Sequence, residues 1–193
     1  MPTETTPSLY AIKLLEVLAE LGIQRRPLIQ ASGLGGRQLA DREHPLEIPR
    51  YLKLVELAIE SCDVDDLGFL VGEHTGTLEH GALGYALLSS ATLEESLQRY
   101  TRYQSVLGPL LEVTLEKNET VAHMRVTPRP ALEGFPPGVT RYFLQEWLAN
   151  WNPWSDLIGR SGPFFDHVSI GLADQDQAEA YTRHLGCDVT GWN

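Results

Sequence analysis

The sequence has 193 residues, enough for one domain or a domain with a small appendage, and its 42% apolar residues supply a core, which excludes a wholly disordered chain. Its 15 Lys and Arg residues against 26 Asp and Glu residues give a net charge of -11, which argues against a surface that binds a phosphate backbone. Neither a membrane span of roughly 18 apolar residues nor a secretory signal is present, so we expect a cytoplasmic protein.

The first part of the chain has the periodicity of helices. We expect residues 1–7 to form a flexible polar tail and residues 8–75 to form an all-helical section. Gly22 suits the left-handed conformation that ends a first helix. Pro27 fits the first turn of a second, short helix that ends at Gly33.

Two further helices complete this section. Pro49 is expected in the first turn of a third helix, which has a broad apolar face. Asp63 and Asp65 precede the apolar segment 67–72, where caps and first-turn acids of a fourth helix belong.

A capping box marks the middle of the chain. The Thr92 hydroxyl can accept a hydrogen bond from the backbone N–H of Glu95, and the Glu95 side chain can reach back to the N–H of Thr92. This box predicts the start of an amphipathic helix over residues 93–107, which Gly108-Pro109 ends. A short apolar helix is expected just before it, over residues 81–88.

Strand patterns follow. Apolar and polar residues alternate over residues 111–116, the period of a half-buried strand. A turn candidate at residues 117–120 leads to a second strand at residues 121–126. We therefore expect a β-hairpin over residues 110–127.

The last third of the sequence mixes both kinds of element. A helix over residues 142–151 has an aromatic face and should kink or end at Pro153. A third strand is expected at residues 167–172. Asp174 is expected to cap a helix over residues 175–184, and a fourth strand follows. The predicted class is α+β, with a helical N-terminal section followed by a small mixed sheet, made of the hairpin and the later strands, packed against helices.

Short motifs follow one another along nearly the whole chain: Gly22-Ile23, Ala31-Ser32-Gly33-Leu34, Leu39-Ala40-Asp41, Ile48-Pro49, Asp65 to Gly72, Gly81 to Tyr85, Ser89 to Leu93, Val168-Ser169-Ile170 and Tyr181 to Val189. Their order resembles the ligand-sensing N-terminal domain of AraC-type transcription regulators, usually called the arabinose-binding domain. No single motif is specific, and the order carries the resemblance. Pro153 departs from the pattern expected of the family.

The resemblance implies a bacterial regulator domain that dimerises, binds a small organic effector and catalyses nothing. It also implies a helical subdomain at residues 8–75 and an α/β ligand-sensing subdomain at residues 76–193. Family members end with a helix-turn-helix DNA-binding domain, and nothing in this sequence resembles one. We therefore expect contact with DNA only through a missing, truncated domain, and no contact with a membrane.

Candidate effector contacts lie on the helix with the aromatic face. Phe143, Trp147 and Trp151 are expected to form walls of a pocket or, alternatively, to pack in the core. Arg141 and Gln145 lie one turn apart and could recognise a carboxylate, which would favour an acidic effector with an apolar part. The alternative is a solvated start of the helix.

Three candidates lie outside that helix. His123, on the second strand of the hairpin, could bond to an effector or lie partly exposed. Tyr100 and Tyr103 are three residues apart on the helix of the capping box and could present their hydroxyls to the pocket or pack against the sheet.

The sequence gives little support for metal binding or catalysis. The six histidines never pair at i, i+4, and neither a Gly-x-Ser-x-Gly nucleophile motif nor a phosphate-binding loop occurs, so we expect no metal, no cofactor and no enzyme. A stand-alone small-molecule-binding protein without a DNA role and a small α/β enzyme remain the alternatives. Cys62 and Cys187 are interpreted as free buried thiols, with a disulfide as the alternative.

Overall fold

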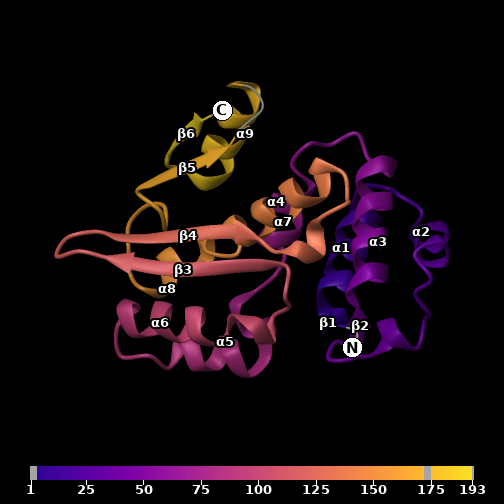
Figure 1. Cartoon of the computed structure of the whole chain (residues 1–193), viewed down its shortest axis with the longest axis horizontal. Helices are drawn as coiled ribbons and strands as arrows, with labels where there is room; N and C mark the ends of the chain where they lie inside the picture. The colour runs from indigo at the N-terminus through magenta and orange to yellow at the C-terminus, as the bar shows by residue number, and fades with distance from the viewer. Residues whose placement is uncertain (1–3, 172–174, 193) are drawn as a thin grey trace.

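The structure is a computed structural model that describes residues 4–171 and 175–192. It begins with a layer of helices, drawn at the right of Figure 1, which confirms the helices expected after the N-terminus. The elements of this layer are β1 (Thr5–Pro7), α1 (Ser8–Glu20), α2 (Arg25–Ala31), η1 (Gln38–Ala40), β2 (Pro45–Glu47) and α3 (Ile48–Ser61).

The antiparallel pair of β1 and β2 corrects two expectations. Thr6 pairs with Leu46 and is only 3% exposed, and its hydroxyl donates a hydrogen bond to the Leu107 carbonyl oxygen 3.1 Å away. The expected flexible tail over residues 1–7 is therefore wrong for Thr5–Pro7, and residues 8–75 are not all helical. Strands of three residues are too short for an alternating pattern to mark them.

Two helices cross closely at the centre of the molecule, α4 (Leu67–Glu73) and α7 (Pro137–Ala149). Gly68 and Gly72 lie one turn apart on the face of α4 that touches α7. A Cβ atom at Gly68 would lie 2.2 Å from the Tyr142 carbonyl oxygen, and one at Gly72 would lie 2.5 Å from the Glu146 carbonyl oxygen. Because only glycine permits this approach, the pair fixes the position of α7 and the direction of its side chains.

A second layer contains the hairpin and the helices beneath it in Figure 1. The Thr92 hydroxyl accepts from the Glu95 N–H at 3.1 Å, which confirms the start of the helix. The returning bond differs, because the Glu95 carboxylate accepts from the N–H of Ala91 at 2.8 Å instead of that of Thr92. The elements are η2 (Thr77–His80), α5 (Gly81–Leu88), α6 (Leu93–Tyr103), η3 (Gln104–Val106), β3 (Leu111–Lys117) and β4 (Ala122–Pro128).

The chain then passes through α7 into a parallel strand pair. Pro153 lies in the first turn of a new helix, so α7 ends before it, as expected. Leu172 and Asp174, the expected strand end and helix cap, lie outside the described residues. The elements are η4 (Pro130–Leu132), α8 (Asn152–Leu157), β5 (His167–Gly171), α9 (Gln175–Leu185) and β6 (Asp188–Trp192).

The α+β class is confirmed, and the described strands form three separate two-stranded sheets. The hairpin of β3 and β4 is antiparallel, whereas β5 and β6 pair in parallel. β5 pairs with β6, the strand that follows α9 in the chain, and within the described residues neither strand pairs with the hairpin. The single mixed sheet that we expected is therefore wrong.

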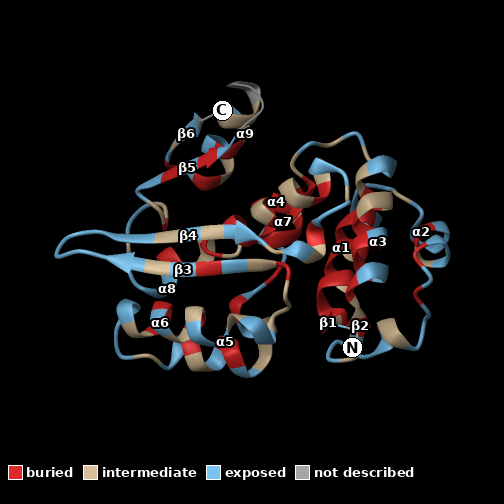
Figure 2. Cartoon of the chain, in the orientation of Figure 1, coloured by how far each residue is buried: buried red, intermediate tan, exposed pale blue. Residues whose placement is uncertain are grey.

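Buried apolar side chains form two clusters that meet at α7. Figure 2 colours the buried residues red, many of them on α1, α3 and the crossing of α4 with α7. The first cluster joins α1, α3 and α4 to the first half of α7, through Tyr142 and Phe143. The second joins the other half of α7, through Trp147 and Leu148, to α5, α6, α8 and α9. α7 therefore packs in both clusters, as does α4, whose Leu67 lies in the first and whose Phe69 lies in the second.

Neither of the two cysteines forms a disulfide. Cys62 and Cys187 are free, and Cys187 is buried whereas Cys62 is half-buried. Over residues 4–171 and 175–192, none of the helices has both the length and the apolar character needed to cross a membrane.

Candidate functional site

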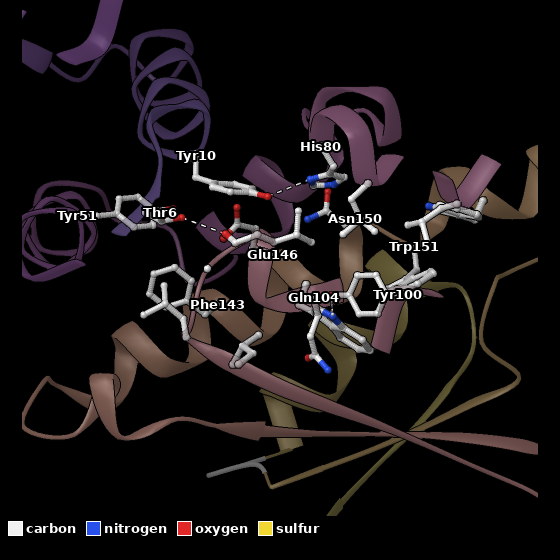
Figure 3. Close-up of a pocket in the computed structure, with 18 residues that line it drawn as sticks. Thr6, Tyr10, Tyr51, His80, Tyr100, Gln104, Phe143, Glu146, Asn150 and Trp151 are labelled. Carbon is white, nitrogen blue, oxygen red and sulfur yellow. Dashed lines mark hydrogen bonds between the residues drawn. The ribbon is translucent and has the colours of Figure 1, made fainter. Parts of the chain in front are cut away.

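A cavity of about 100 Å³ lies beside α7, where the two clusters meet. Figure 3 shows that its lining side chains come from elements far apart in the sequence. β1, α1 and α3 contribute from the N-terminal layer, and η2, α5, α6, η3, β3 and α8 contribute from the rest of the chain. This space is large enough to hold several water molecules or a small organic molecule.

One face of α7 forms the floor of the cavity. Phe143, Glu146, Trp147 and Asn150 follow one another at i, i+3, i+4 and i+7, so their side chains lie on a single stripe. Glu146 is 6% exposed, and within the described part of the chain nothing hydrogen-bonds to its Oε1 atom. The cavity thus contains a carboxyl group with unused hydrogen-bonding capacity.

The surroundings of Glu146 are apolar and aromatic. Burial raises the pKa of the Glu146 carboxyl from 4.5 to about 8, because a charge is poorly solvated in this interior. Tyr10 and Tyr51 point toward it in Figure 3. Burial, and secondarily the charge of Glu146, raises the pKa of both phenols, so they remain neutral.

His80 closes one side of the cavity. Its Nδ1 atom lies 3.0 Å from the Tyr10 hydroxyl, and burial lowers the pKa of its imidazole to about 4, so the ring is neutral at pH 7. The adjacent Glu79 fixes this segment to α1, since its carboxylate lies 3.0 Å from Lys13 Nζ. Burial alone would raise the pKa of Glu79, but hydrogen bonds from Lys13 and the Gly76 N–H lower it.

Three of the predicted contact residues lie next to one another in the lining of the cavity. Trp147 Nε1–H donates to the Tyr100 hydroxyl at 2.8 Å. Trp151 packs edge-on against Tyr100, with ring centroids 4.9 Å apart. Tyr100, Trp147 and Trp151 therefore lie together at the cavity, as does Phe143.

Gln145 and Arg141 lie elsewhere on α7. Gln145 is 3% exposed and bonds to the start of α4, accepting from the Gly68 N–H at 3.3 Å and donating to the Asp65 carbonyl oxygen at 2.9 Å. Arg141 pairs with the exposed Asp65 carboxylate at 3.3 Å. The structure does not bring either residue to the cavity, so the carboxylate-binding pair expected from the sequence is absent from its described lining.

Tyr103 and His123 lie on the surface. Tyr103 is 45% exposed, and the Arg102 guanidinium covers its ring at 5.4 Å. His123 is exposed on β4, opposite Glu116. Neither residue lies at the cavity.

A second, larger hollow of about 590 Å³ lies on the other side of α7. Arg129, Arg141 and Tyr181 are among its lining residues. Burial raises the pKa of the Tyr181 phenol to about 12. Glu146 is not among the residues that line this hollow.

Sequence reasoning missed the polar part of the first cavity. The missed residues are Thr6, Tyr10, Tyr51, His80, Gln104, Glu146 and Asn150. One signal was available, since Glu146 interrupts the aromatic stripe of α7 between Phe143 and Trp147. A carboxylate on an otherwise apolar helix face needs a partner or a role.

Comparison with known proteins supports the family suggested by the motifs. Residues 22–190 match the arabinose-binding domain of AraC transcription regulators, N-terminal. The chain is also 32% identical over 145 residues to the ornithine utilization regulator of Pseudomonas aeruginosa. This alignment covers 75% of the chain but 41% of the relative, so the chain spans about two-fifths of that protein. The chain belongs to the family of N-terminal arabinose-binding domains of AraC transcription regulators.

Proposed function

We propose that this chain is the ligand-sensing and dimerisation domain of an AraC-type regulator, and that a small organic effector occupies the cavity beside α7. Membership of the family supports a regulatory, non-enzymatic role. The observation that carries the proposal is the cavity itself, which lies beside α7 where the two clusters meet. An effector there contacts side chains from both cores at once.

Occupancy of the cavity would then control an attached DNA-binding domain. A bound effector favours whichever packing of the two clusters it fits better, and coupling of about 1–3 kcal/mol is typical of such systems. The net charge of -11 favours contact with DNA through another domain rather than through this one. We further propose a homodimer that acts in the cytoplasm.

A binding screen on the chain tests the proposal. The panel contains ornithine, included because of the relative's name, together with other amino acids, small acids and sugars. A ligand that binds only the folded state raises the melting temperature. Trp147 and Trp151 line the cavity, so tryptophan fluorescence gives a second readout. The proposal fails if no member of the panel changes either signal.

Two variants locate the site of any ligand that binds. Trp147→Phe removes the N–H that bonds to Tyr100 and should weaken binding about tenfold. Arg141→Ala should leave the affinity unchanged, because Arg141 lies at the other hollow. The reverse result would place the effector at the second hollow. Analytical ultracentrifugation checks the proposed dimer.

A further inference from the structure

We propose that the effector of this domain carries a protonated amine whose nitrogen binds to Glu146. This inference rests on the proposed function and specifies the chemical class of the ligand. Three observations support it: the unpartnered carboxyl oxygen, the aromatic walls and the absence of a competing cation in the described lining.

The first observation concerns hydrogen bonding. Glu146 Oε1, Asn150 Oδ1 and the Tyr51 hydroxyl are buried and make no hydrogen bond of ordinary geometry among the described residues, although Asn150 interacts with His80 and Tyr51 with Tyr142. All three side chains line the cavity, and Figure 3 shows Glu146 between the other two. Two of these atoms are acceptors. An alkylammonium group offers three N–H donors, so it can satisfy such a set, whereas a carboxylate ligand would add further acceptors.

The second observation concerns the walls. Tyr10, Tyr51, Phe143, Tyr100 and Trp147 line the same space as Glu146. Aromatic rings attract cations through their faces and also bury the alkyl part of an organic amine. A carboxyl group within aromatic walls therefore suits a cation with an apolar chain.

The third observation concerns charge. The described lining contains no lysine or arginine, and the neutral His80 adds no positive charge. The titratable groups that face Glu146 are Tyr10 from α1, Tyr51 from α3, Tyr100 from α6 and Tyr142 from α7, all phenols that stay neutral. Among the described residues, no cation therefore lies at the cavity to compensate Glu146, and a ligand cation can do so.

Binding of an amine should release a proton. Before an amine binds, the Glu146 carboxyl is mostly protonated at pH 7, because burial raises its pKa to about 8. An ammonium ion favours the charged carboxylate, so about one proton leaves for each amine bound. Calorimetry in two buffers that differ in ionisation enthalpy measures this release.

The test uses three probes with four carbon atoms each: n-butylamine, n-butanol and butyrate. They end in a cation, a neutral hydroxyl and an anion, respectively. Binding is followed by melting temperature and tryptophan fluorescence in wild type, Glu146→Gln and the matched control Glu60→Gln, whose side chain is exposed on α3. We expect n-butylamine to bind best, and Glu146→Gln to weaken it about 10- to 100-fold while Glu60→Gln leaves it unchanged.

The outcomes separate the two proposals. Tighter binding of n-butanol or butyrate, or equal binding of n-butylamine by Glu146→Gln, overturns the amine inference and leaves the sensing function standing. Amine binding without proton release at pH 7 also overturns it. If none of the three probes binds, the inference fails. The sensing function fails only if the broader effector screen is negative as well.

Discussion

Replacing Glu146 with glutamine should change the pH dependence of folding in a defined way. Glutamine has nearly the same shape as glutamate and is neutral at every pH, so the substitution removes the ionisation and keeps the packing. The carboxyl is 6% exposed and nothing in the described structure pairs with its Oε1 atom, so its charged form is strongly disfavoured in the native state.

The size of the effect follows from the pKa of Glu146. Burial raises that pKa from 4.5 to about 8, so between these pH values the native state holds a proton that the unfolded state has released. The stability that wild type has below pH 4.5 is therefore lost as the pH rises through about 8. At about 1.4 kcal/mol for each pKa unit, the loss reaches about 5 kcal/mol, and water entering the cavity reduces it.

Urea unfolding of both proteins at pH 5, 7 and 9, followed by tryptophan fluorescence, measures the effect. We expect the free energies of unfolding to be similar at pH 5, and Glu146→Gln to be more stable by about 2–5 kcal/mol at pH 9. His80, whose pKa is lowered to about 4, acts in the opposite direction: its contribution is present above pH 6.5 and lost as the pH falls through about 4. It is common to both proteins and cancels. A difference that stays constant within about 0.5 kcal/mol from pH 5 to 9 would show that Glu146 is solvated.

Three substitutions test the packing around the site by thermal and urea unfolding. Gly68→Ala should destabilise the protein by about 2–4 kcal/mol because its Cβ would lie 2.2 Å from a carbonyl oxygen of α7, whereas Gly36→Ala, with open space around it in the described structure, should change stability little. Gln145→Ala should lower the free energy of unfolding by about 1–3 kcal/mol, because it leaves two backbone groups at the start of α4 unpaired. Arg141→Ala, which removes an exposed ion pair, should lower it by less than about 1 kcal/mol. Equal losses would contradict the assigned bonds. Thr92→Ala should lower the free energy of unfolding by about 1 kcal/mol, because it removes the side chain that caps α6. An unchanged melting temperature would show that the cap is dispensable.

Local elements were predictable because their signals are local. The hairpin follows from alternation, and the start of α6 follows from Thr92. The short strands β1 and β2 carry no such signal and form through their pairing with each other. The parallel pairing of β5 with β6 likewise depends on a connection that periodicity does not specify.

On α7, the sequence predicts Phe143 and Trp147 as pocket residues, and both line the cavity. Helix geometry alone is enough to show that Arg141 and Gln145 face another way. Residues two positions apart on a helix point about 200° apart, so Arg141 and Gln145 cannot share a face with Phe143 and Trp147. The structure places the first pair away from the cavity and the second pair at it. His80 and the other polar lining residues of the N-terminal half belong to elements far from α7 in the sequence. Only the tertiary packing places them beside α7, so local sequence patterns do not predict them.

The double role of α7 limits which substitutions this chain can accept near the cavity. One side of this helix packs closely against the glycines of α4, and its other sides carry aromatic side chains that are buried in the two clusters. A substitution on it must therefore satisfy several neighbours simultaneously. Recognition of a new molecule is easier to evolve through Thr6, His80 or Gln104, which reach the chamber from short elements. In this domain, substitutions at these three positions should therefore change ligand selectivity at a smaller loss of stability than substitutions on α7.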